Sequence, residues 1–171
     1  HKTKWQAEEL VRNSGLTYTI FRPSLIVGKN GELTNMILAM MNKGYVPLIG
    51  NGSFRYQPVA AVNIVQGFVN ALKTPIAENK MYEVGGPDII TWRDMMDIIA
   101  KVVNKKPMKM GSPVFIMRIM ATLFDRYKWF PLTRDQITMA VEESVCTDWQ
   151  SFYKDLNTTP IKLEDNLRSF L

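Results

Sequence analysis

The first 28 residues constrain the fold of this chain more than any other stretch. Apolar residues recur at helical spacing from Lys2 to Ser14, and Gly15 is a typical residue just after a helix, where the backbone turns left-handed. The segment 17–21 is β-branched or aromatic throughout, which favours a strand. Arg22-Pro23-Ser24 then ends this strand, because proline cannot donate a backbone hydrogen bond. A helix that leads into a buried strand is half of a βαβ unit, and α/β proteins bind ligands at the carboxyl ends of such strands.

Strand and helix signals alternate along the remaining chain. We expect strands at 45–49, 54–59, 80–84 and 107–111. We expect helices at 33–43, 114–130, 133–143, 148–156 and 162–171. Two more helices are expected between them: Asn63 caps the first, and Thr91 begins the second with a capping box to Asp94. This alternation predicts an α/β fold.

Composition limits the class of protein. A chain of 171 residues that is 46% apolar can bury one core or slightly more. The single cysteine, Cys146, excludes an internal disulfide and is typical of a reducing compartment, so we expect a cytoplasmic protein. The formal net charge of +5 is spread along the chain without aromatic–basic clusters, which indicates a solvated basic surface and no nucleic-acid partner.

Two kinds of active site are excluded by the residues present. His1 is the only histidine and Cys146 the only cysteine, so the chain offers no metal site. The same shortage excludes a Ser-His-Asp or Cys-His catalytic arrangement within this chain.

The most apolar helix expected, at 114–130, has two interpretations. Arg118 interrupts its apolar run, which is too short to cross a membrane. A basic amphipathic helix rich in methionine and aromatic residues can lie on a membrane surface or handle a quinone. We favour a helix of a small domain packed over a cleft, and keep the membrane surface as an alternative.

Several motifs, taken in their order and spacing, resemble the second half of the extended and atypical short-chain dehydrogenases. They are Lys4-x-x-x-Glu8, Ser14-Gly15-Leu16, Tyr18 to Ser24, Gly28, Pro47, Gly50-x-Gly52, Gln57-Pro58-Val59, Tyr82 to Pro87 and Pro131 to Gln136. The most similar branch holds the nucleotide-binding accessory subunit of respiratory complex I and NAD(P)-binding epimerase-like proteins. The resemblance implies the carboxyl-terminal part of a Rossmann-type parallel sheet plus a small mixed α/β substrate domain. Residues 1–43 and 60–86 would belong to the first part, and residues 44–59 and 87–171 to the second.

Two features of that family are missing from the chain. The glycines of Gly28-Lys29-Asn30-Gly31 and Gly50-Asn51-Gly52 lack the spacing and the strand–helix context of the family's phosphate-binding turn. If Lys4 is the lysine of the family's Tyr-x-x-x-Lys pair, the tyrosine would fall one residue before His1. We therefore expect the carboxyl-terminal fragment of a larger protein, inactive in isolation, whose parent binds NAD or NADP.

The resemblance also implies roles for individual residues. Lys4 would hold the nicotinamide ribose and lower the pKa of the tyrosine, which makes it both cofactor-binding and catalytic. Pro23 and Ser24 would approach the nicotinamide carboxamide. Arg55 lies near the family's arginine for the substrate diphosphate, whereas Arg22 is expected to make a structural hydrogen bond.

Two functions remain open for the parent protein. The first is an NAD(P)-dependent oxidoreductase or a nucleoside-diphosphate-sugar epimerase-like enzyme. The alternative is a non-catalytic nucleotide-binding assembly module like the complex I accessory subunit. In this family the strand at 17–21 has further strands beside it, so the fragment would expose a strand edge. We expect self-association of the fragment around residues 2–21.

Overall fold

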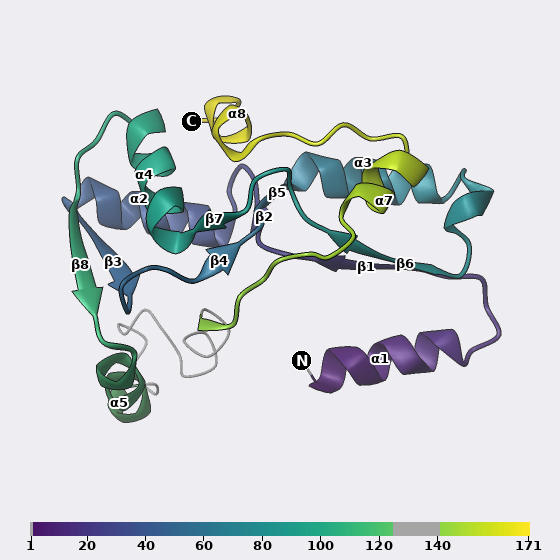
Figure 1. The fold of residues 1–171 in the computed structure, drawn as a ribbon, viewed down its shortest axis with the longest axis horizontal. Coiled ribbons are helices and arrows are strands. Elements are labelled where there is room, and N and C mark those ends of the chain that lie inside the picture. The colour runs from purple at the N-terminus through teal and green to yellow at the C-terminus, as the bar shows by residue number, and fades with distance from the viewer. Residues whose placement is uncertain (1, 125–140) are drawn as a thin grey trace.

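The computed structural model describes residues 2–124 and 141–171 (Figure 1). The elements run in the order α1 (Lys2–Arg12), β1 (Thr19–Pro23), β2 (Ile26–Val27), α2 (Glu32–Asn42), β3 (Tyr45–Ile49), β4 (Arg55–Tyr56), β5 (Val59–Ala60), α3 (Ala61–Ala71), the 3-10 turn η1 (Pro75–Ala77), β6 (Lys80–Val84), β7 (Ile90–Thr91), α4 (Trp92–Val102), β8 (Met108–Ser112), α5 (Val114–Phe124), α7 (Gln150–Asp155) and α8 (Leu163–Arg168). The alternation of strands and helices confirms the predicted α/β class.

Parallel pairing dominates the described strands, as a βαβ chain requires. β1 pairs with β6 in register from Thr19↔Lys80 to Pro23↔Val84. β2 pairs parallel with β5, β3 pairs parallel with β8, and β4 pairs antiparallel with β7. The β1–β6 pair is the part of the Rossmann-type sheet that the sequence predicted.

One hydrophobic core covers a single face of the β1–β6 pair. The ring of Phe21 packs edge-on against Phe68 of α3 and Phe152 of α7, and stacks on Tyr82 of β6. Figure 1 shows α3 and α7 on this side of the pair and α1 on the other. Gly67 of α3 lies under Phe152, where an added Cβ would meet the ring at 2.4 Å. The glycine therefore lets α3 approach α7 closely.

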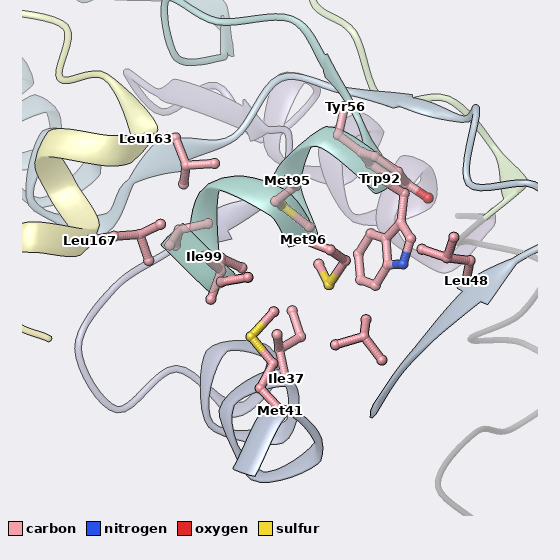
Figure 2. Packing of buried hydrophobic residues seen from close by; sticks show 13 residues of the cluster. Ile37, Met41, Leu48, Tyr56, Trp92, Met95, Met96, Ile99, Leu163 and Leu167 are labelled. Atoms are coloured by element: carbon pink, nitrogen blue, oxygen red, sulfur yellow. The ribbon is translucent and has the colours of Figure 1, made fainter. Parts of the chain in front are cut away.

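A second core joins α4 to α2, β3 and α8 (Figure 2). The predicted capping box is confirmed, because Thr91 Oγ1 accepts the backbone N–H of Asp94 and the Asp94 side chain accepts that of Thr91. α4 then presents its apolar face to the other elements. The core contains Trp92, Met95, Met96 and Ile99 of α4, Ile37 and Met41 of α2, Leu48 of β3, and Leu163 and Leu167 of α8.

Three local predictions were wrong. Residues 54–59 do not form one strand: β4 pairs with β7, β5 pairs with β2, and β3 pairs with β8 rather than with β4. Asn63 does not cap α3, because the N-cap is Ala60. β1 runs from Thr19 to Pro23 rather than over residues 17–21. Most of the segments expected as helices at 125–130 and 133–143 lies outside the described residues.

No helix among the described residues has both the length and the apolar character needed to cross a membrane. α5 exposes Phe115, Ile119 and Leu123. The membrane-surface alternative for this segment therefore stays a prediction.

Apolar side chains remain exposed around β1. A stripe on α3 is exposed, with Leu72 at 88%, and α1 exposes a further set of apolar side chains. The α3 stripe contains Val62, Val65, Phe68, Val69 and Leu72, and the α1 set contains Trp5, Leu10 and Val11. β1 also has no second strand neighbour among the described residues. Patches of this kind are uncommon on monomers.

We therefore expect the 171-residue chain to self-associate through this region at high micromolar concentration, as sedimentation velocity would measure. Leu72→Asp should weaken the association, because it places a charge in the α3 stripe. Met108→Asp is a matched control, since Met108 is exposed on β8, outside this region. A monomeric profile for the unaltered chain would contradict the prediction.

Candidate functional site

The candidate site lies at the carboxyl ends of β1 and β6. The pairing of these strands ends at Pro23↔Val84, and the backbone N–H of Ser24 continues it by donating to Val84 O at 3.0 Å. Gly85 and Gly86 follow β6 directly. Pro23 and Ser24, two of the predicted cofactor-binding residues, therefore stand where ligands bind in α/β folds.

An extended segment crosses this end of the sheet. We call residues 143–148, which precede α7, the strap. Its backbone runs parallel to β4: Ser144 N donates to Arg55 O at 3.0 Å, and Gln57 N donates to Ser144 O at 3.0 Å. Ser24 Oγ lies 2.6 Å from Ser144 O and 2.9 Å from Ser144 Oγ. The hydroxyl of a predicted cofactor-binding residue is thus bonded to the strap.

A buried glutamine anchors the middle of the strap. The side chain of Gln57 is fully buried, and its Nε2 donates to Gly86 O at 2.7 Å. Its Oε1 accepts the backbone N–H of Cys146 at 2.9 Å. A Cβ added at Gly85 would lie 2.5 Å from the Gln57 side chain, so glycine is needed for this close approach. Burial raises the pKa of the Cys146 thiol to about 11, which keeps it protonated.

A glutamate at the end of β6 holds the far end of the strap. Glu83 Oε2 accepts the backbone N–H of Thr147 at 2.6 Å and that of Asp148 at 3.3 Å. Just beyond, α7 buries Phe152 and Tyr153, and Tyr153 donates its hydroxyl to Gly85 O at 2.9 Å. The carboxyl end of the strap is therefore fixed to the core.

Arg55, the predicted substrate-binding residue, pairs with the strap. Its Nε lies 3.0 and 3.2 Å from the two carboxylate oxygens of Glu143, and its Nη2 lies 2.7 Å from Oε2. The hydrogen bond from Arg55 lowers the pKa of Glu143, so this carboxyl is ionised at neutral pH. Both side chains are exposed, at 58% and 42%. The guanidinium of Arg55 is thus paired with a carboxylate of the same chain, and its assignment to a substrate diphosphate remains a prediction.

Lys4, the predicted catalytic lysine, is exposed on α1. One turn further along the same helix, the Glu8 carboxylate accepts hydrogen bonds from Nε and Nη2 of Arg22 at the carboxyl end of β1, which lowers the pKa of Glu8. The pair fixes α1 to the strand that carries Pro23 and Ser24, and it gives Arg22 the structural role expected of it. The assignments of Lys4, Pro23 and Ser24 to a nicotinamide remain predictions.

Sequence reasoning missed Gln57, Glu83 and Ser144 as site residues. Both Gln57 and Glu83 belonged to a predicted strand and to a family motif, but neither was assigned a role in a site. The Gly85-Gly86 pair was the available signal, because adjacent glycines after a strand indicate that another segment approaches closely.

A hollow of about 340 Å³ lies beside the strap, between β6 and α7. Two of its charged groups form an ion pair: Asp155 Oδ2 lies 2.9 Å from Lys80 Nζ, and it also accepts the hydroxyl of Tyr82 at 3.0 Å. These bonds lower the pKa of Asp155, with Lys80 the larger cause. In the part of the chain that the structure describes, no cluster of His, Cys, Asp or Glu could hold a metal ion.

Several solved structures with a similar fold are named as sugar-nucleotide epimerases or dehydratases. A nucleoside-diphosphate-sugar epimerase from Staphylococcus aureus is similar with a TM-score of 0.72 at 18% identity, over 96% of this chain and 56% of that one. The UDP-glucuronic acid 4-epimerase of Bacillus cereus, in complex with UDP-glucuronic acid and NAD, has a TM-score of 0.66 at 16% identity. The match covers 96% of this chain and 47% of the epimerase. No protein-family model matches the chain.

The fold of these structures and the sequence relatives agree with the resemblance to the extended and atypical short-chain dehydrogenases. In sequence the chain is similar to the mitochondrial NADH dehydrogenase (ubiquinone) 1 alpha subcomplex subunit 9 of several organisms. The Arabidopsis thaliana protein is 31% identical over 99% of this chain and 45% of its own length. The Dictyostelium discoideum protein is 27% identical over 97% of this chain and 48% of its own length. The chain thus spans about half the length of the curated relatives that it matches.

Proposed function

We propose that this chain is the carboxyl-terminal part of a longer protein that binds NAD or NADP. The observation that carries the proposal is the parallel β1–β6 pair, whose carboxyl ends bring Pro23 and Ser24 together beside the strap. Similarly folded epimerases are described in complex with NAD, which supports a dinucleotide as the ligand. The chain by itself would contribute one side of the cofactor site and would be inactive.

In the longer protein, the residues of this chain would act on the nicotinamide half of the cofactor. Lys4 would hold the ribose hydroxyls, and Pro23 and Ser24 would face the carboxamide. If a tyrosine stands one turn before Lys4, its proton transfer would accompany hydride transfer to or from the nicotinamide. The protein would then be an NAD(P)-dependent oxidoreductase or an epimerase-like enzyme.

A second candidate function is a non-catalytic nucleotide-binding module that serves assembly with protein partners. Two observations favour it. The curated relatives are named as subunits of a larger enzyme. Arg55, which would bind a sugar-nucleotide diphosphate, is paired with Glu143.

Lys4→Met in the longer protein tests the proposal. The affinity for NADH and NADPH, measured by calorimetry, should fall about ten- to a hundredfold, because a hydrogen bond from a charged group contributes about 1.5–3 kcal/mol. Lys73→Met is the matched control, since Lys73 is exposed just after α3. If the protein turns over a hydroxyl or carbonyl substrate, Lys4→Met should also shift its pH–rate profile upward. Unchanged affinity would contradict the role of Lys4, and absent turnover with intact binding would favour the assembly module.

A further inference from the structure

Two loops of the chain contain an exposed asparagine followed by glycine, at Asn30-Gly31 and Asn51-Gly52. In such a pair the backbone nitrogen of the glycine can attack the side-chain amide of the asparagine within the same chain, because glycine has no side chain to shield that nitrogen. The two pairs are the same dipeptide, so any difference in their reactivity comes from the folded surroundings.

Asn51 is hydrogen-bonded at both of its carbonyl oxygens. Arg93, in the first turn of α4, donates to the backbone oxygen of Asn51 from Nε at 3.2 Å and from Nη2 at 2.9 Å. The side-chain oxygen of Asn51 accepts the backbone N–H of Ser53 at 3.0 Å. Arg93 also donates its backbone N–H to Gly52 O at 3.0 Å, which holds this loop against the start of α4. In the described part of the chain, no side chain donates to the backbone oxygen of Asn30, and its side-chain oxygen accepts no hydrogen bond.

Each of these contacts favours one part of the attack. Loss of the proton from the Gly52 nitrogen leaves a negative charge that resonance shares with the backbone oxygen of Asn51. The guanidinium of Arg93 lies on that oxygen and stabilises the charge. Attack on Cγ of Asn51 then moves negative charge onto Oδ1, where the Ser53 N–H acts as the donor of an oxyanion hole does.

We propose that Asn51 is a site of spontaneous deamidation, which Arg93 and the Ser53 N–H promote. Hydroxide removes the Gly52 proton, a bond forms between the Gly52 nitrogen and Cγ of Asn51, and the Cγ–Nδ2 bond breaks to release ammonia, with a proton supplied by water. Water then adds to either carbonyl carbon of the succinimide, and the bond from that carbon to the ring nitrogen breaks. The product has an aspartate or an isoaspartate at position 51. Isoaspartate adds one atom to the backbone, so it would shift Gly52 O away from the Arg93 N–H at the start of α4.

Peptide mapping by mass spectrometry on the 171-residue chain tests the proposal. Trypsin cuts after Lys43 and Arg55, so Asn51 is the single asparagine in the peptide 44–55. During incubation of the folded chain at mildly alkaline pH, deamidation at Asn51 should be faster than at Asn30. In guanidinium chloride the two rates should become similar, because the hydrogen bonds that distinguish the two sites are lost.

Arg93→Met should slow deamidation of Asn51 in the folded chain about two- to fivefold, the contribution expected of one exposed charge. Lys106→Met is the matched control, since it removes the same charge beyond the other end of α4, and it should leave the rate unchanged. Arg93→Lys keeps the charge without the planar pair of donors, so its rate should fall between those of Arg93→Met and the unaltered chain. If Arg93→Met does not fold, as circular dichroism would show, Arg93→Lys and the comparison of Asn51 with Asn30 decide.

Three results would overturn the proposal. They are deamidation at Asn51 no faster than at Asn30 in the folded chain, the same ratio of the two rates in guanidinium chloride, and an unchanged or faster rate at Asn51 in folded Arg93→Met. None of these measurements involves NADH or NADPH, so their outcome is independent of the proposed function.

Discussion

Replacing Phe152 by alanine is expected to lower the free energy of unfolding by about 3–5 kcal/mol, the usual loss for a fully buried aromatic side chain. Phe152 has no exposed surface. Its ring packs edge-on against Phe21 at 5.6 Å and Tyr82 at 6.3 Å, and so joins α7 to both strands of the main pair. Gly67 opposite it has no side chain to fill the vacated space. Urea denaturation followed by tryptophan fluorescence would measure the loss.

Phe115→Ala is the matched control for this truncation. Phe115 is 64% exposed on α5, so removal of its ring should change stability by well under 1 kcal/mol. Comparable losses for the two variants would contradict the placement of α7 on the β1–β6 pair. Loss of the strap contacts in Phe152→Ala is a second expected effect, because α7 anchors the strap.

Asn63→Asp is expected to cost about 3–5 kcal/mol at neutral pH, since it places an unpaired charge in the interior. Asn63 lies on α3 and is fully buried, and its Nδ2 donates to Thr159 O at 2.8 Å. An aspartate would set a carboxylate oxygen against that carbonyl and lose the donor.

The cost of Asn63→Asp should depend on pH. Burial without a donor raises the pKa of the new carboxyl in the folded state above its unfolded value near 3.9. The folded state then binds the proton more tightly than the unfolded state does. The variant is therefore closest in stability to the unaltered chain at low pH, and it loses stability as pH rises through the folded-state pKa. Asn70→Asp is the matched control on the same helix, because Asn70 donates to Leu156 O at 2.7 Å but is only partly buried. Equal and pH-independent losses for both would contradict the account.

The parts of the fold that the sequence predicted are those set by local patterns. The bounds of β3 and β6 matched the prediction, and the Thr91 capping box began α4 as expected. Gly15 has a φ of 73°, in agreement with its predicted place after the first helix. Each of these features depends on neighbouring residues only.

The features that were missed depend on partners far away in the chain. β3 pairs with β8, some sixty positions later, rather than with the next strand along the chain. The strap carries no periodic pattern of its own, because Gln57, Glu83 and Arg55 position it from outside. For the candidate site, the sequence pointed to Ser24 and Arg55 but not to the segment that binds both.

The central claim is that this chain holds one side of a dinucleotide site that only the longer protein completes. Calorimetry with NADH and NADPH on both proteins tests it most directly. The account predicts saturable micromolar binding of one of the two by the longer protein and no saturable binding by the 171-residue chain, because the phosphate-binding turn that favours the pyrophosphate would lie outside this chain. Micromolar binding by the 171-residue chain alone would contradict it.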